Sequence, residues 1–414
     1  MTSCSSDEPL DPEQTKAHIE NALTSLNIRN AQAIYYKGSN SRAGEDDNGY
    51  YKLDTSGNEV KLEISDDQGK VQNIRIDKMV KLSDRYLLLQ PNFYDLRAVI
   101  EKSHDNWQDG EYEIMVEACS ITCIVDNQTG TLYKIPRIGI GENAGYDNTT
   151  VSTVNGISYF NGYYYSEDYM ADGMSMQIFK FNPNELTITA LLPEYQTFSK
   201  FTVNDLGFVG YYEYQESASA KVKCPGGSIV QLGTDDILTI SNNFYTIENN
   251  IIKRWTANGS NGLTSADVCA MPDNASTLKL ANHLQDVYLF YGYTEAGKEA
   301  TYQFNGKEFT LLDVAIPQEL YTVGFETRDA WYNAENNMKL QKLSKVDYSI
   351  SSIDISGYQI VEFVASPESP DVSFTGIRYS DSKKVIGKID ADNNIEIESA
   401  FTSGSSIYDL IPIN

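Results

Sequence analysis

The sequence is poor in the side chains that most often carry out chemistry. It has three histidines, His18, His104 and His283, and they lie far apart in the chain. No motif of a histidine zinc site or of a Ser-His-Asp triad surrounds them. Cysteine is also scarce: five residues are too few for a disulfide framework in a chain of 414 residues.

Two of these cysteines, Cys119 and Cys123, stand close together in the run EACSITCIV. The run has the composition of a strand, in which residues four apart share a face but lie about 13 Å from each other. One disulfide cannot bridge that distance. We therefore expect buried thiols here.

Positive charge and long apolar runs are also lacking. The chain has 32 Lys and Arg against 58 Asp and Glu, a net charge of −26. A surface this acidic argues against nucleic acid and anionic lipid as partners, and solubility is its simplest explanation. No run approaches the roughly 18 apolar residues of a membrane-spanning helix.

Tyrosine and turn residues are abundant instead. The 29 tyrosines favour half-exposed strands, and short alternating runs are broken by Asn, Asp and Gly. One pattern recurs: an apolar strand, a polar turn and a second apolar strand. It occurs in residues 53–62, 125–136, 179–193, 222–233, 242–255, 302–317, 345–357 and 387–399.

The spacing of these hairpins, on average roughly 45–50 residues, is that of propeller blades. One or two further strands precede each hairpin, which predicts an all-β fold: a β-propeller of about seven or eight four-stranded blades, with eight favoured. The first unit, Ala33 to Ser65, is one strand short. We expect residues 406–413, an unpaired strand by their pattern, to complete it. The alternative is a pair of β-sandwich domains, which would need no fixed period.

A helix is predicted before the strands begin. Asp11 and Pro12 form a helix start, and Ile19, Leu23 and Leu26 follow at helical spacing. The predicted layout is a tether over 1–10, this helix over 11–30 and the propeller over 31–414. A second short helix is predicted over 95–102, in an insertion that serves as a packing element or as a lid.

The strand units resemble the β-propellers of secreted bacterial proteins that lack strong motifs. The resemblance covers roughly residues 31–414. Trp-Asp repeats and the Asp-box of sialidases are absent, so the resemblance implies a fold and no particular activity.

Aromatic side chains beside acidic ones are the candidates for ligand binding. Flat rings stack on sugars or apolar ligands, and carboxylates accept hydrogen bonds from hydroxyl groups. The alternative is that the same tyrosines pack between sheets. The candidate residues are Tyr163, Tyr165, Asp168, Tyr169, Tyr212 and Trp331.

Three acidic turns offer oxygen ligands that calcium could use: residues 44–49, 65–69 and 390–394. None matches a full twelve-residue calcium loop, and Asp, Asn and Gly are also the residues that turns require. We therefore expect no cofactor, with calcium as the alternative, and no catalytic or metal-ligating residue is assigned.

The first residues resemble the end of a bacterial lipobox. Ser3 matches the small residue of that motif and Cys4 the cysteine that becomes lipidated, although Met1 stands where Leu is usual and no apolar segment precedes it. The next residues, SSDEP, resemble the acidic export tether of Bacteroidetes lipoproteins. The resemblance implies a lipid anchor on Cys4, which two acyl chains would make stable.

These observations predict a lipid-anchored propeller of the cell envelope, on the outer-membrane surface or facing the periplasm. We expect it to bind a glycan or an envelope protein without catalysis. One alternative is a glycan-active hydrolase or lyase that uses carboxylates, because an acidic chain offers many Asp and Glu. Another is a scaffold subunit of an outer-membrane complex.

Overall fold

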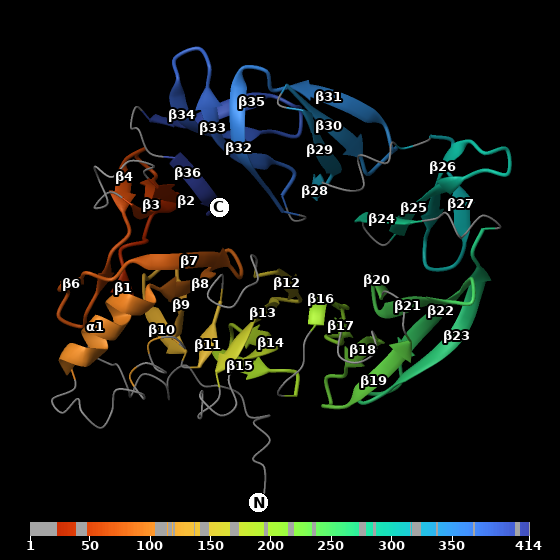
Figure 1. The fold of residues 1–414 in the computed structure, drawn as a ribbon, viewed down its shortest axis with the longest axis horizontal. Helices are drawn as coiled ribbons and strands as arrows, with labels where there is room; N and C mark the ends of the chain where they lie inside the picture. Colours follow the sequence, from red (N-terminus) through yellow and green to blue (C-terminus); the bar gives the residue numbers. More distant parts are fainter. Residues whose placement is uncertain are drawn as a thin grey trace, which may run out of the picture. The chain divides into compact units, whose positions relative to one another are not determined.

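A computed structural model shows how most of the chain folds, and it consists mainly of strands (Figure 1). The structure describes residues 23–38, 48–103, 114, 118, 121–135, 137–140, 149–165, 174–193, 198–213, 219–233, 237–272, 279–284, 287–314, 316, 324–336, 338–366, 369–401 and 406–413. The chain divides into two compact units. One comprises residues 1–34, 49–223 and 413–414, and the other comprises residues 35–48 and 224–412.

Four-stranded antiparallel sheets follow one another along the chain, and in most of them the strand order is the sequence order. One sheet contains β7 (Ile76–Lys81), β8 (Tyr86–Pro91), β9 (Thr122–Asp126) and β10 (Leu132–Ile135). Another contains β16 (Phe198–Val203), β17 (Val209–Glu213), β18 (Ser219–Lys223) and β19 (Ile229–Gly233). The next contains β20 (Leu238–Ile240), β21 (Asn243–Glu248), β22 (Ile251–Ala257) and β23 (Leu263–Ala270).

The same order continues toward the end of the chain. One sheet contains β24 (Lys279–Leu284), β25 (Val287–Tyr293), β26 (Glu299–Phe304) and β27 (Phe309–Leu311). The next contains β28 (Gly324–Glu326), β29 (Ala330–Asn336), β30 (Lys339–Ser344) and β31 (Ile350–Asp354). The last contains β32 (Tyr358–Ala365), β33 (Val372–Arg378), β34 (Lys383–Ile389) and β35 (Ile395–Phe401).

Two sheets depart from this pattern. The five-stranded one contains β11 (Ile138–Gly139), β12 (Val151–Val154), β13 (Ile157–Tyr165), β14 (Met174–Asn182) and β15 (Thr187–Ala190), with β11 and β12 both paired to β13. The three-stranded one contains β1 (Ser25–Leu26), β5 (Ile64–Ser65) and β6 (Val71–Gln72).

The hairpins predicted from the sequence are confirmed. Between β21 and β22, for example, Asn249 and Asn250 have positive φ angles of 53° and 62°. Two such residues in succession make the tight turn that joins antiparallel strands, and Asn tolerates this backbone conformation better than most residues. The Asn-rich turn in the sequence therefore gives the observed register, with Glu248 opposite Ile251.

Within each unit, neighbouring sheets bury apolar side chains against each other. Leu88 of β8 and Phe179 of β14 belong to one core, so the β7–β10 sheet packs on the β11–β15 sheet. In the second unit the sheet of β28–β31 is covered twice. Leu343 and Trp331 pack with Leu289 of β25, and Tyr332 packs with Phe374 of β33. The cores thus continue from sheet to sheet instead of joining sheets in isolated pairs.

The last strand completes the first four-stranded sheet, as the sequence predicts. The sheet has the order β36 (Ser406–Pro412), β2 (Ala31–Gly38), β3 (Gly49–Asp54) and β4 (Glu59–Lys61). The main-chain N–H of Ile413 donates to the main-chain oxygen of Gln32 (2.8 Å). The ring centroids of Tyr408 and Tyr36 lie 4.9 Å apart.

Successive four-stranded antiparallel sheets that pack on their neighbours within each unit, together with a first sheet that includes the last described strand, define a β-propeller. A β-sandwich pair would instead bury each sheet against a single partner.

The helix predicted over 11–30 does not reach residue 30, which corrects that boundary. Leu26 lies in strand β1 and pairs with Ile64, because the β-sheet hydrogen bonds of β5 are available to it. Both Leu23 and Leu26 are buried, so the apolar spacing arises from core packing. The rest of the predicted helix and the tether over 1–10 lie outside the described residues.

The second predicted helix is confirmed as α1 (Phe93–Ser103), between β8 and β9. The Asn92 side chain caps its start by accepting a hydrogen bond from the Asp95 N–H (3.1 Å). Leu96 and Ile100 are fully buried, so the described part of this insertion packs on the body of its unit.

The closing strand provides a stability test. We expect a chain that ends at residue 405 to lose its cooperative thermal unfolding, because β2 would lose the partner on one edge. We expect Leu410→Ala, which removes a side chain that is 4% exposed, to lower the free energy of unfolding by about 2–5 kcal/mol. Tyr379→Ala, at an exposed hairpin position, is the control. Unchanged calorimetric unfolding of the shortened chain would contradict the assignment.

Candidate binding site

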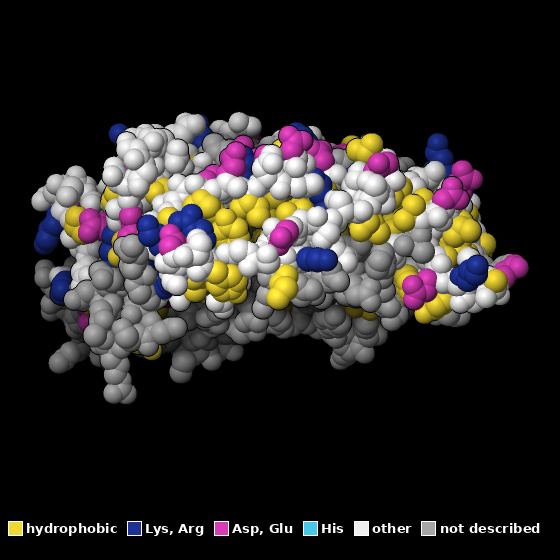
Figure 2. Space-filling view, turned by 90° about the horizontal axis from the view of Figure 1, so that it is seen from above, with side chains coloured by type: hydrophobic (Ala, Val, Ile, Leu, Met, Phe, Trp, Pro, Cys, Tyr) yellow, Lys and Arg dark blue, Asp and Glu magenta, His cyan; other side chains and the backbone are white. Residues whose placement is uncertain are grey.

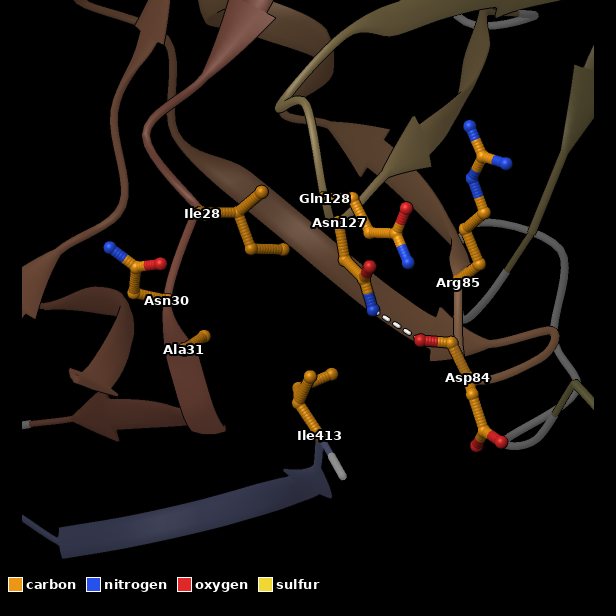
Figure 3. Close-up of a pocket in the computed structure, with 8 residues that line it drawn as sticks. All are labelled: Ile28, Asn30, Ala31, Asp84, Arg85, Asn127, Gln128 and Ile413. Atoms are coloured by element: carbon orange, nitrogen blue, oxygen red, sulfur yellow. Dashed lines mark hydrogen bonds between the residues drawn. The ribbon is translucent and has the colours of Figure 1, made fainter. Parts of the chain in front are cut away.

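A polar hollow of about 410 Å³ lies within the first unit, where three loops meet one residue from the end of the chain (Figure 3). One loop joins β1 to β2, the second joins β7 to β8 and the third joins β9 to β10. The residues that line it are Ile28, Asn30, Ala31, Asp84, Arg85, Asn127, Gln128 and Ile413.

Asp126, the last residue of β9, organises the β9–β10 turn. Its Oδ1 accepts hydrogen bonds from the main-chain N–H groups of Gln128 (3.0 Å) and Thr129 (3.4 Å). Aspartate is common at this position of a turn, because its short side chain can accept a hydrogen bond from the backbone N–H two residues further on. Gly130 closes the turn with a φ of 77° and leaves no room for a Cβ against the Leu26 oxygen.

The other oxygen of Asp126 holds the neighbouring β7–β8 turn. Its Oδ2 accepts hydrogen bonds from Arg85 Nη2 (2.7 Å) and Arg85 Nε (3.2 Å). Burial disfavours the charge on Asp126, but the Arg85 guanidinium and the turn N–H groups outweigh it and lower the pKa of the carboxyl. The same hydrogen bond raises the pKa of Arg85, so both groups are held in their charged forms.

Asn127 makes a second connection between these turns. Its side-chain Nδ2 donates to the main-chain oxygen of Asp84 (Figure 3), and its main-chain N–H donates to the Arg85 oxygen (2.9 Å). Asn127 is only 9% exposed. A buried side chain that donates a hydrogen bond to the backbone restricts the movement of the turns it connects, so this wall of the hollow is preformed.

The third loop is fixed by long-range bonds to the backbone. Arg29 Nε donates to the Thr129 oxygen (2.8 Å), and Lys52 Nζ donates to the Arg29 oxygen (2.7 Å). Asn30 turns the chain into β2 with a φ of 62°. These contacts place Ile28 and Ala31 on the side of the hollow opposite Asn127 (Figure 3).

The aromatic candidates from the sequence lie elsewhere. Tyr163 and Tyr165 of β13 are 7% and 4% exposed, and the Tyr165 ring covers the Gly139 backbone. Trp331 is 7% exposed and packs in an apolar core, whereas Tyr212 of β17 is half-buried. The structure therefore shows the three buried side chains in packing positions. Asp168, Tyr169 and Cys4 lie outside the described residues.

Two of the three acidic turns bond their carboxylates to their own backbone, and the carboxylates of the turn at 44–49 lie outside the described residues. Asp66 Oδ1 accepts from the N–H groups of Gln68 (3.1 Å) and Lys70 (2.8 Å), and Asp390 Oδ1 accepts from the Asn394 N–H (2.8 Å). Within the described ranges, no group of three or more His, Cys, Asp or Glu is placed to hold a metal ion. Cys123, Cys224 and Cys269 are free thiols, and burial raises the pKa of Cys123 to about 12.

Among the described residues, acidic and basic side chains are both present on the face drawn in Figure 2. Hydrophobic side chains gather there in patches, and acidic and basic side chains are scattered between them. No helix among the described residues is long and apolar enough to cross a membrane.

Sequence reasoning missed the hollow. Its polar residues lie in turns. Asp, Asn and Gln also occur in other turns of the chain, so these residue types do not mark the hollow. Which turns meet is decided by strand pairing over long sequence distances, such as the 41 positions between Arg85 and Asp126. The hairpin predicted over 125–136 contains one of these turns, but the pattern does not indicate which other turns lie beside it.

No protein-family model matches this chain, and no curated protein matches it by sequence. The β-propeller domain of the Trilobed protease from Pyrococcus furiosus is similar in structure, with 9% identity and a TM-score of 0.41. That match covers 78% of this chain and 95% of the domain. A puromycin-hydrolyzing peptidase from Mycobacterium tuberculosis has 10% identity and a TM-score of 0.43. The match covers 94% of this chain and 55% of the peptidase. Likenesses of this degree assign no activity.

Removing the Asp126 charge tests the connection between the turns. We expect Asp126→Asn to lower the free energy of unfolding at pH 7 by about 1–3 kcal/mol, because the hydrogen bonds to Arg85 lose their charge. The folded-state pKa of Asp126 is lowered from its usual 3.8. Its contribution is therefore present above about pH 4 and is lost as pH falls through the folded-state pKa.

Chemical denaturation between pH 7 and pH 2 measures this effect. The variant should lose less stability than the wild type below pH 4. Asp67→Asn, in an exposed turn of the same unit, is the matched control and should follow the wild-type curve. Parallel pH curves for wild type and Asp126→Asn would show that the ion pair contributes nothing.

Proposed function

We propose that this β-propeller is a lipid-anchored protein of the cell envelope that binds a glycan or a protein partner without catalysis. The hollow in the first unit is the observation that carries the binding proposal. Its lining consists of aliphatic side chains, amides and one charged group of each sign. The charged groups make ion pairs, Arg85 with Asp126 and Asp84 with Lys81. Such a lining is suited to hydrogen bonding and apolar contact, the usual means of ligand binding.

The membrane address rests on the first residues. Ser3 and Cys4 are similar to the end of a lipobox, and an acidic segment follows them. A lipid anchor suits an acidic body, since the net charge of −26 would repel an anionic membrane surface. The proposed location is the outer membrane, either at the cell surface or facing the periplasm.

Mass spectrometry of protein isolated from its natural membrane tests the anchor. We expect an N-terminal Cys4 that carries lipid, with Met1 to Ser3 removed. Cys4→Ala should move the protein from the membrane fraction to the soluble fraction, and Cys269→Ala is the matched control that should leave it in the membrane. An intact Met1 and an unmodified Cys4 in the natural protein would refute the anchor.

Binding and catalysis are separated by a second set of measurements. We expect a glycan array or a pull-down from envelope extract to give a ligand, and the bound glycan to be recovered uncleaved. Cleavage of the bound glycan would establish the hydrolase or lyase alternative. A membrane protein as the single partner, with blank glycan arrays, would establish the scaffold alternative.

A further inference from the structure

The hollow combines two kinds of wall. Ile28, Ala31 and Ile413 form an aliphatic side, and Asn127 with Gln128 forms an amide side (Figure 3). A ligand that fills it must offer a small apolar group next to hydrogen-bonding groups. The lining contains no aromatic ring, so stacking on a flat sugar face is not its mode of recognition.

The charges at the rim are already satisfied. Asp84 Oδ1 lies 2.9 Å from Lys81 Nζ, and Arg85 is paired with Asp126. Figure 3 shows the Asp84 carboxylate and the Arg85 guanidinium directed away from the centre of the hollow. A charged ligand would have to compete with these ion pairs while it loses its own hydration, so the hollow favours a neutral ligand.

The amide groups leave hydrogen-bonding capacity for a ligand. Asn127 Nδ2 donates a hydrogen bond to the main-chain oxygen of Asp84. Its Oδ1 makes no hydrogen bond with the described residues. Gln128 is exposed, and in the part of the chain that the structure describes its side chain has no partner. Together they offer one acceptor and one amide with both donor and acceptor atoms.

The volume of about 410 Å³ is at the lower end of ligand pockets, which range from about 300 to 1,000 Å³. It suits one sugar ring with a substituent. Among neutral sugar substituents, an acetamido group carries a methyl for the aliphatic wall together with an N–H and a C=O for the amides. We infer that the hollow binds a neutral N-acetylated hexosamine, an inference that rests on the proposed binding function.

Titration calorimetry with four monosaccharides tests this assignment: N-acetylglucosamine, N-acetylgalactosamine, glucose and the cationic glucosamine. We expect at least one N-acetylated sugar to bind about tenfold more tightly than glucose and glucosamine. Gln128→Ala should weaken that binding about three- to tenfold, the cost of one neutral hydrogen bond. Ala31→Tyr should abolish it by filling the hollow.

Gln68→Ala is the matched control, since Gln68 is an exposed turn glutamine of the same unit outside the hollow. It should bind as the wild type does. Circular dichroism and thermal unfolding check that each variant folds. If Ala31→Tyr does not fold, Gln128→Ala alone still tests the inference. Equal affinity for all four sugars, no binding of any, or binding that neither variant changes would overturn the inference.

Failure of the proposed binding function can be distinguished from failure of the hexosamine assignment. If a glycan array gives a ligand that N-acetylated hexosamines do not displace, the binding function stands and the assignment of the hollow falls. If neither glycan nor envelope protein binds, both fall.

Discussion

The pairing of β36 with β2 is the interaction on which the rest of the fold depends. A four-stranded sheet cannot bury its own faces, so each sheet needs a neighbour with a complete surface. The first sheet has that surface only when the last strand is bonded to it through contacts such as Ile413 to Gln32. Ordering such distant segments costs chain entropy, which the buried side chains of β36, Ile407 and Leu410 among them, help to offset.

The hollow shows how one side chain can serve both the fold and the site. Asp126 ends β9, caps the following turn with one oxygen and holds Arg85 with the other. Its buried charge is stable because it is paired and hydrogen-bonded on both oxygens. A loop that is fixed in this way loses little freedom when a ligand arrives, which favours binding.

Local patterns predicted most of the fold. Turn residues such as Asn249 and Asn250 determine a hairpin by themselves, and the Asn92 cap with the apolar Leu96 and Ile100 determines α1. The spacing of Leu23 and Leu26 led to a wrong end for the predicted helix. Two apolar residues three positions apart are typical of a helix, but a buried strand residue and a buried residue just before the strand can have the same spacing. Leu26 lies in the core because it pairs with Ile64, which is 38 positions away, and a local pattern does not contain such a pairing.

The candidate site was harder to predict for the same reason. Tyr163, Tyr165 and Trp331 have the composition of a sugar-binding surface, but the sequence does not show which strand face is covered by the next sheet. Their burial is decided by packing between sheets. Arg85, Asn127 and Ile413 come from three distant parts of the chain, and only the completed sheets bring them to one hollow.

The order of the strands in the sequence also determines when the first sheet can be completed during synthesis. The β2 strand is made early and β36 follows every other described strand, so during synthesis the first sheet waits with one edge open. An unpaired edge is a place where other chains can add and aggregate. Completion of this sheet is therefore delayed until β36 has been synthesised.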